Sequence, residues 1–370
     1  MSQFFSALDP EIGYWIALTR VGRIGPRRFD LLLRAFGSAS RVWDASEAIL
    51  GEAGLDRRTV KSLAAARQRV DPTREVENLA RAGARAIRSI DPEYPALLGR
   101  IYDPPPVLYV QGELDPPEHP AIAVVGTRTA TSYGKMAAER LSGDLAAAGV
   151  TIVSGLALGI DAAAHRGALA AGGRTVAVLG HGLDRTYPSQ HSPLAKQIAQ
   201  HGALVTEFPL GTKPDAVNFP RRNRLISGLT SGTLVVEAGA RSGALITAAF
   251  AAEQGRDVYA VPGSIFSPAS EGTNGLIRDG AAPVTRVGDV LAELHPSRAP
   301  RQLSAQDILP LDDTEQRLLG VLSTEPLHID EIAQMVALPM STVSAALAMM
   351  ELKGVVQQSG GMNYVRGIRS

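Results

Sequence analysis

Residues 150–180 read "VTIVSGLALGIDAAAHRGALAAGGRTVAVLG", and this stretch decides the fold class. Two apolar runs, residues 150–155 and 175–180, flank an alanine-rich segment that has the composition of a helix and ends on glycine. A continuous apolar run is typical of a strand that is buried on both faces, as in a parallel sheet. The stretch therefore predicts a strand–helix–strand unit with parallel strands.

The same alternation extends in both directions from this unit. Further apolar runs occur at residues 121–126, 203–208, 233–239 and 257–263, and helical patterns that end on glycine lie between most of them. The sequence therefore predicts an α/β fold with a Rossmann-like, doubly wound parallel sheet over residues 121–295.

The flanking segments predict two smaller domains. Residues 1–70 contain two helix–hairpin–helix-like units, and residues 71–120 form a connecting segment that we expect to pack on the central domain. Residues 296–312 are a linker rich in Pro and Ser. Residues 313–370 read as three helices and a hairpin, which is the winged-helix pattern, but they hold more acidic than basic residues. We therefore expect protein contact or a vestigial module there, rather than the reading of duplex DNA.

Composition limits the classes of function. The chain has 370 residues, 37 basic and 37 acidic side chains and no cysteine. Any affinity for a polyanion must come from local clustering of cations, and disulfides and thiolate metal sites are excluded. The sequence shows neither a signal-peptide pattern nor an apolar run of the ~20 residues that a membrane span needs. We expect a cytoplasmic protein without membrane contact.

Ligands of an open parallel sheet bind beyond the carboxyl ends of the strands. The segments expected at this edge are rich in Gly, Ser, Thr and Arg: residues 126–134, 154–161, 180–188, 208–228 and 237–247. Neither a GxGxxG nor a GxxxxGK[ST] motif is present, so a standard dinucleotide or Walker site is not predicted. Small residues before helices still offer backbone N–H groups to anions. The pattern therefore predicts phosphate binding without a cofactor.

Four arginines accompany these segments. Arg128 follows the first strand, and Arg221, Arg222 and Arg224 lie in the long segment 208–228, which we expect to be a loop. Guanidinium groups bind phosphate oxygens in pairs, and exposed aromatic rings stack on the bases of single strands. Five aromatic residues fall near this edge, and Phe219 is the one that we expect to be exposed, the others being Tyr133, Tyr187, Phe208 and Phe266.

The sequence offers little support for catalysis. No G-x-S-x-G elbow and no metal-ligand spacing are present, so we predict neither catalytic residues nor a metal. His165, within a predicted helix, is expected to be structural, and Asp161 is expected to be a helix-terminal acid.

A set of motifs then identifies a family. "VVGTR", "IVSGLALGIDAAAH", "AVLGHGLDRTYP", "NFPRRNRLISGLTSGTLVVEA", "GRDVYAVPG" and "GTNGLIRDGA" together resemble the DNA-processing protein A family (DprA/Smf). The resemblance implies a non-enzymatic protein of natural transformation that binds and protects incoming single-stranded DNA and helps to load the RecA recombinase. It also implies a homodimer through the Rossmann-like domain, a sterile-alpha-motif-like (SAM-like) helical domain and a winged helix.

Residue by residue, the resemblance and the loop positions give one expected DNA-binding set: Gly126, Arg128, Ser154, Gly155, Asn218, Phe219, Arg221, Arg222, Arg224, Ser227 and Gly228. The family often has a basic residue just after the Tyr-Pro of the third loop, where this chain has Ser189. We expect Arg185 to substitute for it.

An enzymatic alternative stays open at this point. Residues 222–238 are also similar to the nucleotide-ribohydrolase fold of lysine-decarboxylase-like proteins, in which an Arg and a Glu act on a nucleoside monophosphate. Arg224 and Glu237 would hold those roles, but "LTSGT" at residues 229–233 replaces the expected PGGxGT loop.

Overall fold

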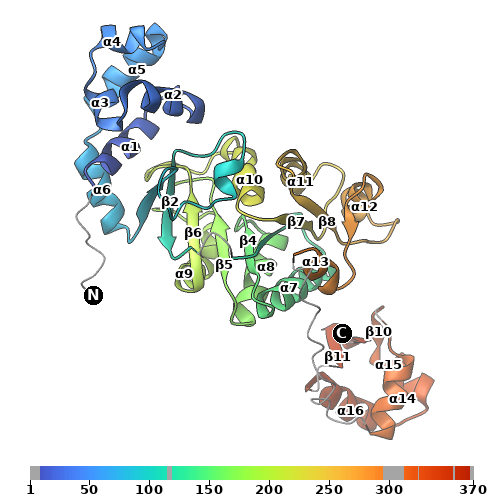
Figure 1. Cartoon of the computed structure of the whole chain (residues 1–370). Helices are drawn as coiled ribbons and strands as arrows, with labels where there is room; N and C mark the ends of the chain where they lie inside the picture. Colours follow the sequence, from blue (N-terminus) through green and yellow to red (C-terminus); the bar gives the residue numbers. More distant parts are fainter. Residues whose placement is uncertain (1–8, 115–118, 295–311, 324, 353–354, 367–370) are drawn as a thin grey trace. The chain divides into compact units, whose positions relative to one another are not determined.

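The computed structural model describes residues 9–114, 119–294, 312–323, 325–352 and 355–366. Most of the expected linker, residues 296–312, and Lys353 lie outside these ranges. The chain divides into two compact units, residues 1–297 and residues 298–370 (Figure 1).

The first unit contains one large mixed sheet. Its nine strands follow the order β1-β2-β6-β5-β4-β3-β7-β8-β9. They are β1 (Arg85–Arg88), β2 (Val107–Gly112), β3 (Ala121–Val125), β4 (Thr151–Ser154), β5 (Thr175–Val178), β6 (Gly202–Thr206), β7 (Gly232–Val235), β8 (Asp257–Ala260) and β9 (Ala282–Pro283). The strands from β6 to β9 in this order are mutually parallel, as the apolar runs predict.

The sequence did not predict that the connecting segment would extend this sheet. β2 pairs antiparallel with both β6 and β1. Because β2 runs opposite to β6, its first residues lie at the edge where the parallel strands end. The loop that precedes β2 is therefore at the carboxyl edge of the sheet.

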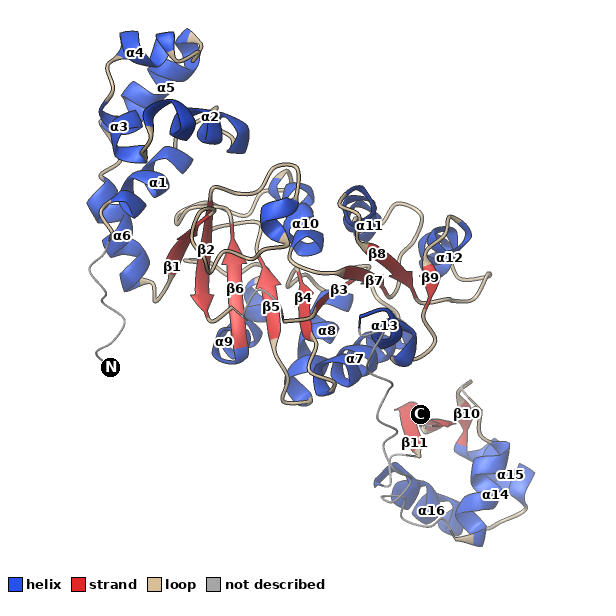
Figure 2. Ribbon diagram, viewed as in Figure 1, coloured by secondary structure: helices blue, strands red, loops and turns tan. Residues whose placement is uncertain are grey.

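Helices cover both faces of the sheet (Figure 2). Side chains alternate along a strand, so Ile122 and Val124 of β3 pack in one core and Ala123 and Val125 in another. The first face is covered by α7 (Ser132–Ala147), α8 (Ile160–Ala170) and α9 (Ser192–His201), and the second by α10 (Asn218–Gly228) and α11 (Ala244–Glu253). The remaining elements of the central region are η1 (Leu98–Arg100), η2 (Ser189–His191), η3 (Pro268–Ser270), α12 (Glu271–Arg278) and α13 (Gly288–Leu294).

Glycines end several of these helices, as the sequence indicates. Gly149 follows α7 and Gly172 follows α8, with φ angles of 85° and 69°. This left-handed conformation suits a residue without Cβ.

A group of short helices precedes the sheet. They are α1 (Glu11–Thr19), α2 (Pro26–Phe36), α3 (Ala39–Asp44), α4 (Glu47–Glu52), α5 (Arg57–Arg67) and α6 (Pro72–Arg81). Their apolar side chains belong to the same core as Tyr109 of β2 and Ile198 of α9. The helical segment is therefore packed on the sheet by continuous apolar contact.

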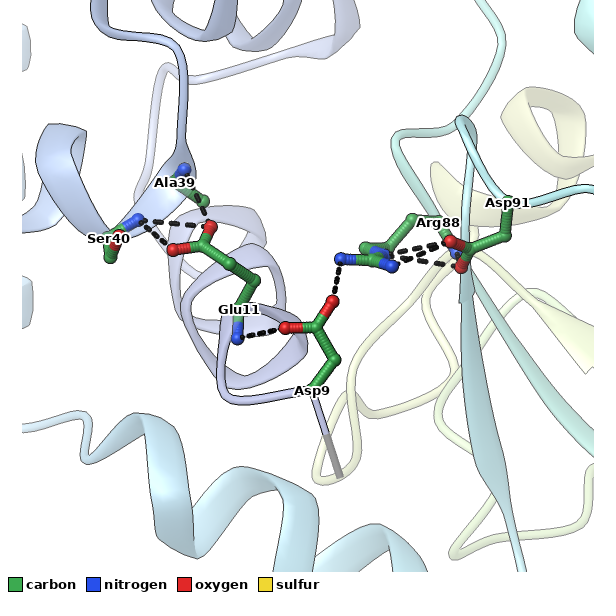
Figure 3. A network of polar contacts seen from close by, with 6 residues as sticks. All are labelled: Asp9, Glu11, Ala39, Ser40, Arg88 and Asp91. Carbon is green, nitrogen blue, oxygen red and sulfur yellow. Dashed lines mark hydrogen bonds and ion pairs between the residues drawn. The ribbon is translucent and has the colours of Figure 1, made fainter. Parts of the chain in front are cut away.

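A polar network strengthens this attachment (Figure 3). Arg88 at the end of β1 pairs with Asp9 at 2.7 Å and with Asp91 at 2.8 Å. Asp9 accepts a hydrogen bond from the backbone N–H of Glu11, and the Glu11 carboxylate accepts one from the N–H of Ala39. The Arg88 guanidinium thus connects β1 to the start of α1. The Glu11 carboxylate then connects α1 to the start of α3.

The second unit has the winged-helix arrangement. Its helices are α14 (Asp313–Val321), α15 (Ile329–Val336) and α16 (Met340–Leu352), and its three strands are β10 (Leu327–His328), β11 (Val356–Gly360) and β12 (Asn363–Arg366). The expected hairpin is β11–β12, and β10 adds a third strand that the sequence did not predict.

Within the described part of the chain, no single helix has both the length and the apolar character needed to cross a membrane. The helices Ile329–Val336 and Met340–Glu351, which meet at a sharp bend, reach that length and apolar character only when both are counted together.

Candidate nucleic-acid interface

A cleft of about 580 Å³ opens at the carboxyl ends of the parallel strands. The end of β3 and the first turns of α10 and α11 line it, with Gly126, Arg128, Phe219 and Thr247 among the lining residues. The strand order reverses between β3 and β7, because the chain runs outward from β3 in one direction and from β7 in the other. The cleft therefore lies at the topological switch point, where open α/β sheets bind ligands.

One wall of the cleft carries an exposed cation on an aromatic ring. The Arg128 guanidinium lies 5.4 Å from the centre of the Phe219 ring, and the Tyr187 ring lies 5.6 Å from the same ring. Arg128 and Tyr187 are exposed, and Phe219 is half-buried. A stacked cation beside aromatic faces is the combination that binds phosphates and bases of a single strand.

The floor of the cleft holds a buried arginine. Arg222 donates hydrogen bonds to the carbonyl oxygens of Gly155 and Val178, at 2.9 Å for Gly155. Burial lowers the pKa of the Arg222 guanidinium from its ordinary value to about 10, and the charge of Asp161 opposes that shift. The group is therefore protonated at neutral pH. Gly155 is needed because a Cβ there would overlap the guanidinium.

Arg221 and Arg224 share one carboxylate at the end of β6. Their Nη2 atoms lie 3.2 Å and 2.5 Å from Oε2 of Glu207. Arg224 and Glu207 are each only 5% exposed, and Arg224 also donates to the carbonyl oxygen of Asp103 at 2.8 Å. Arg221 is 53% exposed and lies over the Phe208 ring at 5.5 Å. Burial raises the pKa of Glu207, and the charge of Arg224 counteracts this.

The expectation that these arginines occupy a loop was wrong. They lie in α10, where successive residues turn by about 100°, so Arg221, Arg222 and Arg224 point in three directions. Pro220 resembles a helix breaker in the sequence, but it lies in the first turn, where no N–H donor is required. Only Arg221 of the three remains exposed to solvent.

The other residues expected to bind DNA also divide into accessible and buried ones. Gly126 and Asn218 are accessible at the edge, and Gly126 lines the cleft. The Ser154 hydroxyl is buried and donates to the Val124 carbonyl at 2.6 Å. Ser227 and Gly228 lie inside the fold, where Gly228 packs against Leu98 and Ile101. Direct DNA contact by Ser154, Arg224, Ser227 or Gly228 is thus inconsistent with their burial.

The five aromatic residues also differ from expectation. Phe219 is half-buried, whereas Phe266 is 89% exposed and Tyr133 and Tyr187 are about half exposed. Phe208 is buried beneath Arg221. The ring of Phe219 instead packs near Gly180, which leaves one face toward Arg128.

Residues considered for catalysis have structural roles. Asp161 accepts hydrogen bonds from the N–H groups of Gly155 and Ala157, in the first turn of α8. His165 bonds Thr175 at 2.6 Å and is fully buried, which lowers its pKa to about 3. No group of three metal-ligating side chains occurs among the described residues.

The enzymatic alternative is not favoured. Its two residues have separate partners: Glu237 accepts hydrogen bonds from the N–H and hydroxyl of Thr131, at 2.8 and 2.6 Å, whereas Arg224 pairs with Glu207 and Asp103. Arg185, the expected substitute for a basic residue at Ser189, is exposed but lies 3.3 Å from Asp184.

Sequence reasoning missed the importance of Glu207. The signal was present, because an acid at the end of an apolar strand precedes three arginines within one segment. A carboxylate that ends a buried strand needs a cationic partner, and the arginine cluster was the nearest candidate.

Fold and cleft together define a Rossmann-like α/β protein with a cleft at its switch point and a carboxy-terminal winged helix. Residues 85–295 match the family model described as DNA recombination-mediator protein A, and residues 302–362 match the DprA winged helix domain. The chain therefore belongs to the DNA recombination-mediator protein A family.

Relatives agree with this assignment. The chain is 36% identical to Protein Smf from Synechocystis sp. over 97% of this chain and 99% of that protein. It is 43% identical to Protein Smf from Escherichia coli over 74% and 75%, respectively.

Two solved structures are also similar. DNA processing protein A from Streptococcus pneumoniae superposes with a TM-score of 0.67 at 36% identity, covering 76% of this chain and 97% of that chain. A structure of DNA processing protein A from Helicobacter pylori, described by its single-stranded DNA binding mode, gives a TM-score of 0.52 at 28% identity and covers 58% and 97%.

Proposed function

We propose that this protein binds single-stranded DNA at the strand-end cleft, without sequence preference and without catalysis, in the cytoplasmic processing of DNA during transformation. The observation that carries the proposal is Arg128 stacked over Phe219 at the wall of the cleft. Family membership and the DNA-binding relative from H. pylori support it.

The proposed contact set is narrower than the one expected from sequence. We retain Gly126, Arg128, Asn218, Phe219 and Arg221, with Arg222 at the floor, where it bonds the Gly155 carbonyl. Arg128 and Arg221 would bind phosphates, and the Phe219 and Tyr187 rings would stack on bases. The domain boundaries expected from the sequence remain part of this proposal.

A salt series tests the proposal. Oligothymidylate and duplex DNA of equal length are compared by gel shift and fluorescence anisotropy at several salt concentrations. We expect tighter binding of the single strand and a linear fall of log affinity with log salt, because phosphate contacts release counterions. Equal affinity for duplex, or binding that does not respond to salt, contradicts the proposal.

A homodimer through the Rossmann-like domain is the second part of the proposal. Ile265 and Phe266, in the loop after β8, are 84% and 89% exposed. Adjacent apolar side chains at such exposure are typical of a protein–protein contact. Phe266→Glu is expected to lower the mass measured by light scattering from dimer to monomer, and Ile49→Glu, at an exposed position of α4 outside the Rossmann-like domain, serves as the control. A monomeric wild-type protein contradicts this part.

We also propose that the bound strand is transferred to the RecA recombinase. The measurement is RecA filament formation on single-stranded DNA covered by single-strand-binding protein. The wild-type protein is expected to shorten the lag, and an Arg128→Ala/Arg221→Ala variant is expected to lack that effect. An equal lag with and without the wild-type protein contradicts loading.

A further inference from the structure

The loop that precedes β2 carries an exposed aromatic ring with a cation on it. Tyr102 is 80% exposed, and the Arg27 guanidinium of α2 lies 4.1 Å from the centre of its ring. Neither residue belongs to the cleft. An exposed tyrosine with a stacked arginine repeats, at a second place, the combination of Phe219 and Arg128.

The two places lie on one edge of the sheet. β2 is antiparallel to β6, with Tyr109 opposite Thr206, so the chain before β2 lies beside the end of β6. The contact is direct, because Arg224 of α10 bonds the carbonyl of Asp103, which follows Tyr102. Tyr102 is thus at the carboxyl edge, on the β6 side of α10.

The strand order places the cationic groups in a row. Arg128 follows β3. Arg222 bonds Gly155 after β4 and Val178 at the end of β5. Arg221 pairs with Glu207 after β6, and Tyr102, which carries Arg27, precedes β2. The order β2-β6-β5-β4-β3 is the order of these strands in the sheet. At ~4.8 Å between neighbouring strands, the row from Arg128 to Tyr102 spans roughly 19 Å.

The charge at the second place is available to a ligand. Asp30 pairs with Arg34 at 2.9 Å, and Asp103 pairs with Arg224 at 3.3 Å. Among the described residues, no carboxylate pairs with Arg27, which keeps its donors for a phosphate. A groove of about 300 Å³ beside the ring is lined by Arg27, Ile90 and Tyr102.

The helical segment is held where this contact requires it. Arg20 of α1 donates to the Leu210 carbonyl at 3.0 Å, and the Thr19 hydroxyl lies 2.9 Å from the Tyr109 hydroxyl. With the Arg88–Asp9 pair (Figure 3), these bonds fix the helices against β1, β2 and the segment after β6. Arg27 is therefore presented by a part of the fold that is anchored on the sheet.

We propose that Tyr102 and Arg27 form a second stacking platform for single-stranded DNA, which extends the site from the cleft onto the helical segment. The inference rests on the proposed function of the cleft. A base stacks on the Tyr102 ring, and Arg27 binds the adjoining phosphate. At ~3.4 Å per nucleotide, a strand needs about six nucleotides to reach from Arg128 to Tyr102.

A length series tests this inference on the full-length protein. Affinities of oligothymidylates from about 4 to about 20 nucleotides are measured for the wild type, Tyr102→Ala, Tyr102→Phe and Arg27→Ala. Tyr102→Ala and Arg27→Ala are expected to bind the long strands at least about fivefold more weakly and the shortest strands as the wild type does. Tyr102→Phe is expected to retain wild-type affinity, because it keeps the ring.

Arg57→Ala is the matched control, since Arg57 is an exposed arginine of the same helical segment. An equal loss in Arg57→Ala would indicate a general charge effect and overturn the stacking platform. Unchanged long-strand affinity in Tyr102→Ala would also overturn it. If the wild type binds no strand of any length, the proposed function of the cleft fails instead. If Tyr102→Ala unfolds by circular dichroism, Arg27→Ala decides: a folded Arg27→Ala variant that binds long strands more weakly supports the platform, and one that binds them as the wild type does overturns it.

Discussion

The carboxyl edge of the sheet has two layers that were indistinguishable in the sequence. The inner layer, Arg222 and Arg224, is buried and bonded to carbonyl groups or a carboxylate. The outer layer, Arg128 and Arg221, is exposed beside aromatic rings. Arginines of one short segment thus have two roles. Arg224 stabilises the fold through its ion pair with Glu207, and Arg221 is exposed to solvent. The difference teaches that a cluster of cations in sequence is not a cluster on a surface.

Arg224→Ala is the sharpest test of this comparison. It leaves the Glu207 carboxylate buried without its closest cation, so we expect a loss of about 3–5 kcal/mol in the free energy of unfolding. Arg221→Ala is the matched control, because it pairs with the same carboxylate at the surface and is expected to cost less than about 1 kcal/mol. Urea denaturation measures both. Equal losses would remove the distinction between the layers.

The outer layer is expected to control binding. Arg128→Ala/Arg221→Ala should weaken oligothymidylate binding about 10- to 100-fold while leaving the unfolding midpoint within experimental error. The slope of log affinity against log salt should become shallower by about 0.7 for each phosphate that the variant no longer binds. Anisotropy titrations give both numbers. A variant that binds like the wild type would contradict the assignment of the outer layer.

His165, which bonds Thr175 at the start of β5, offers a pH test of the buried interior beneath this edge. Burial holds its folded pKa at about 3, against ~6.5 in an unfolded chain. Between these values the unfolded chain binds the proton and the folded chain does not, so stability falls as pH falls below about 6.5, by up to ~1.4 kcal/mol per unit.

We expect His165→Asn to remove this contribution. Between pH 7 and pH 5, the free energy of unfolding should fall by about 2 kcal/mol less in the variant than in the wild type. His201→Gln, at an exposed position, should behave like the wild type. Parallel pH profiles for the wild type and His165→Asn would show that His165 carries no such penalty.

The smallest effect is expected from the second unit. The side chains that α16 exposes are mainly Ser, Ala and Met, without a cation among its described residues. Deletion of residues 298–370 should therefore change single-strand affinity by less than about twofold, because phosphate contacts require cations. A loss of tenfold or more would place part of the binding site in the winged helix.

Much of the fold was predictable because its signal is local. Buried parallel strands require continuous apolar runs, and glycine ends helices in a left-handed conformation, so the strands from β3 to β8 could be located in advance. The antiparallel strands β1 and β2 were read as part of a connector. Their place in the sheet depends on pairing with β6, which lies roughly 100 residues further along the chain.

The sequence by itself determined the α/β class, the family and the edge at which we propose that the strand binds, because these follow from the order of strands and the motifs after them. Only the tertiary structure decided which arginines are exposed to solvent. Helix α10 rotates successive side chains by about 100°, and the position of Glu207 then fixes which of them is buried. Rotation and partner position are properties of the packed chain, so spacing along the sequence does not reveal them.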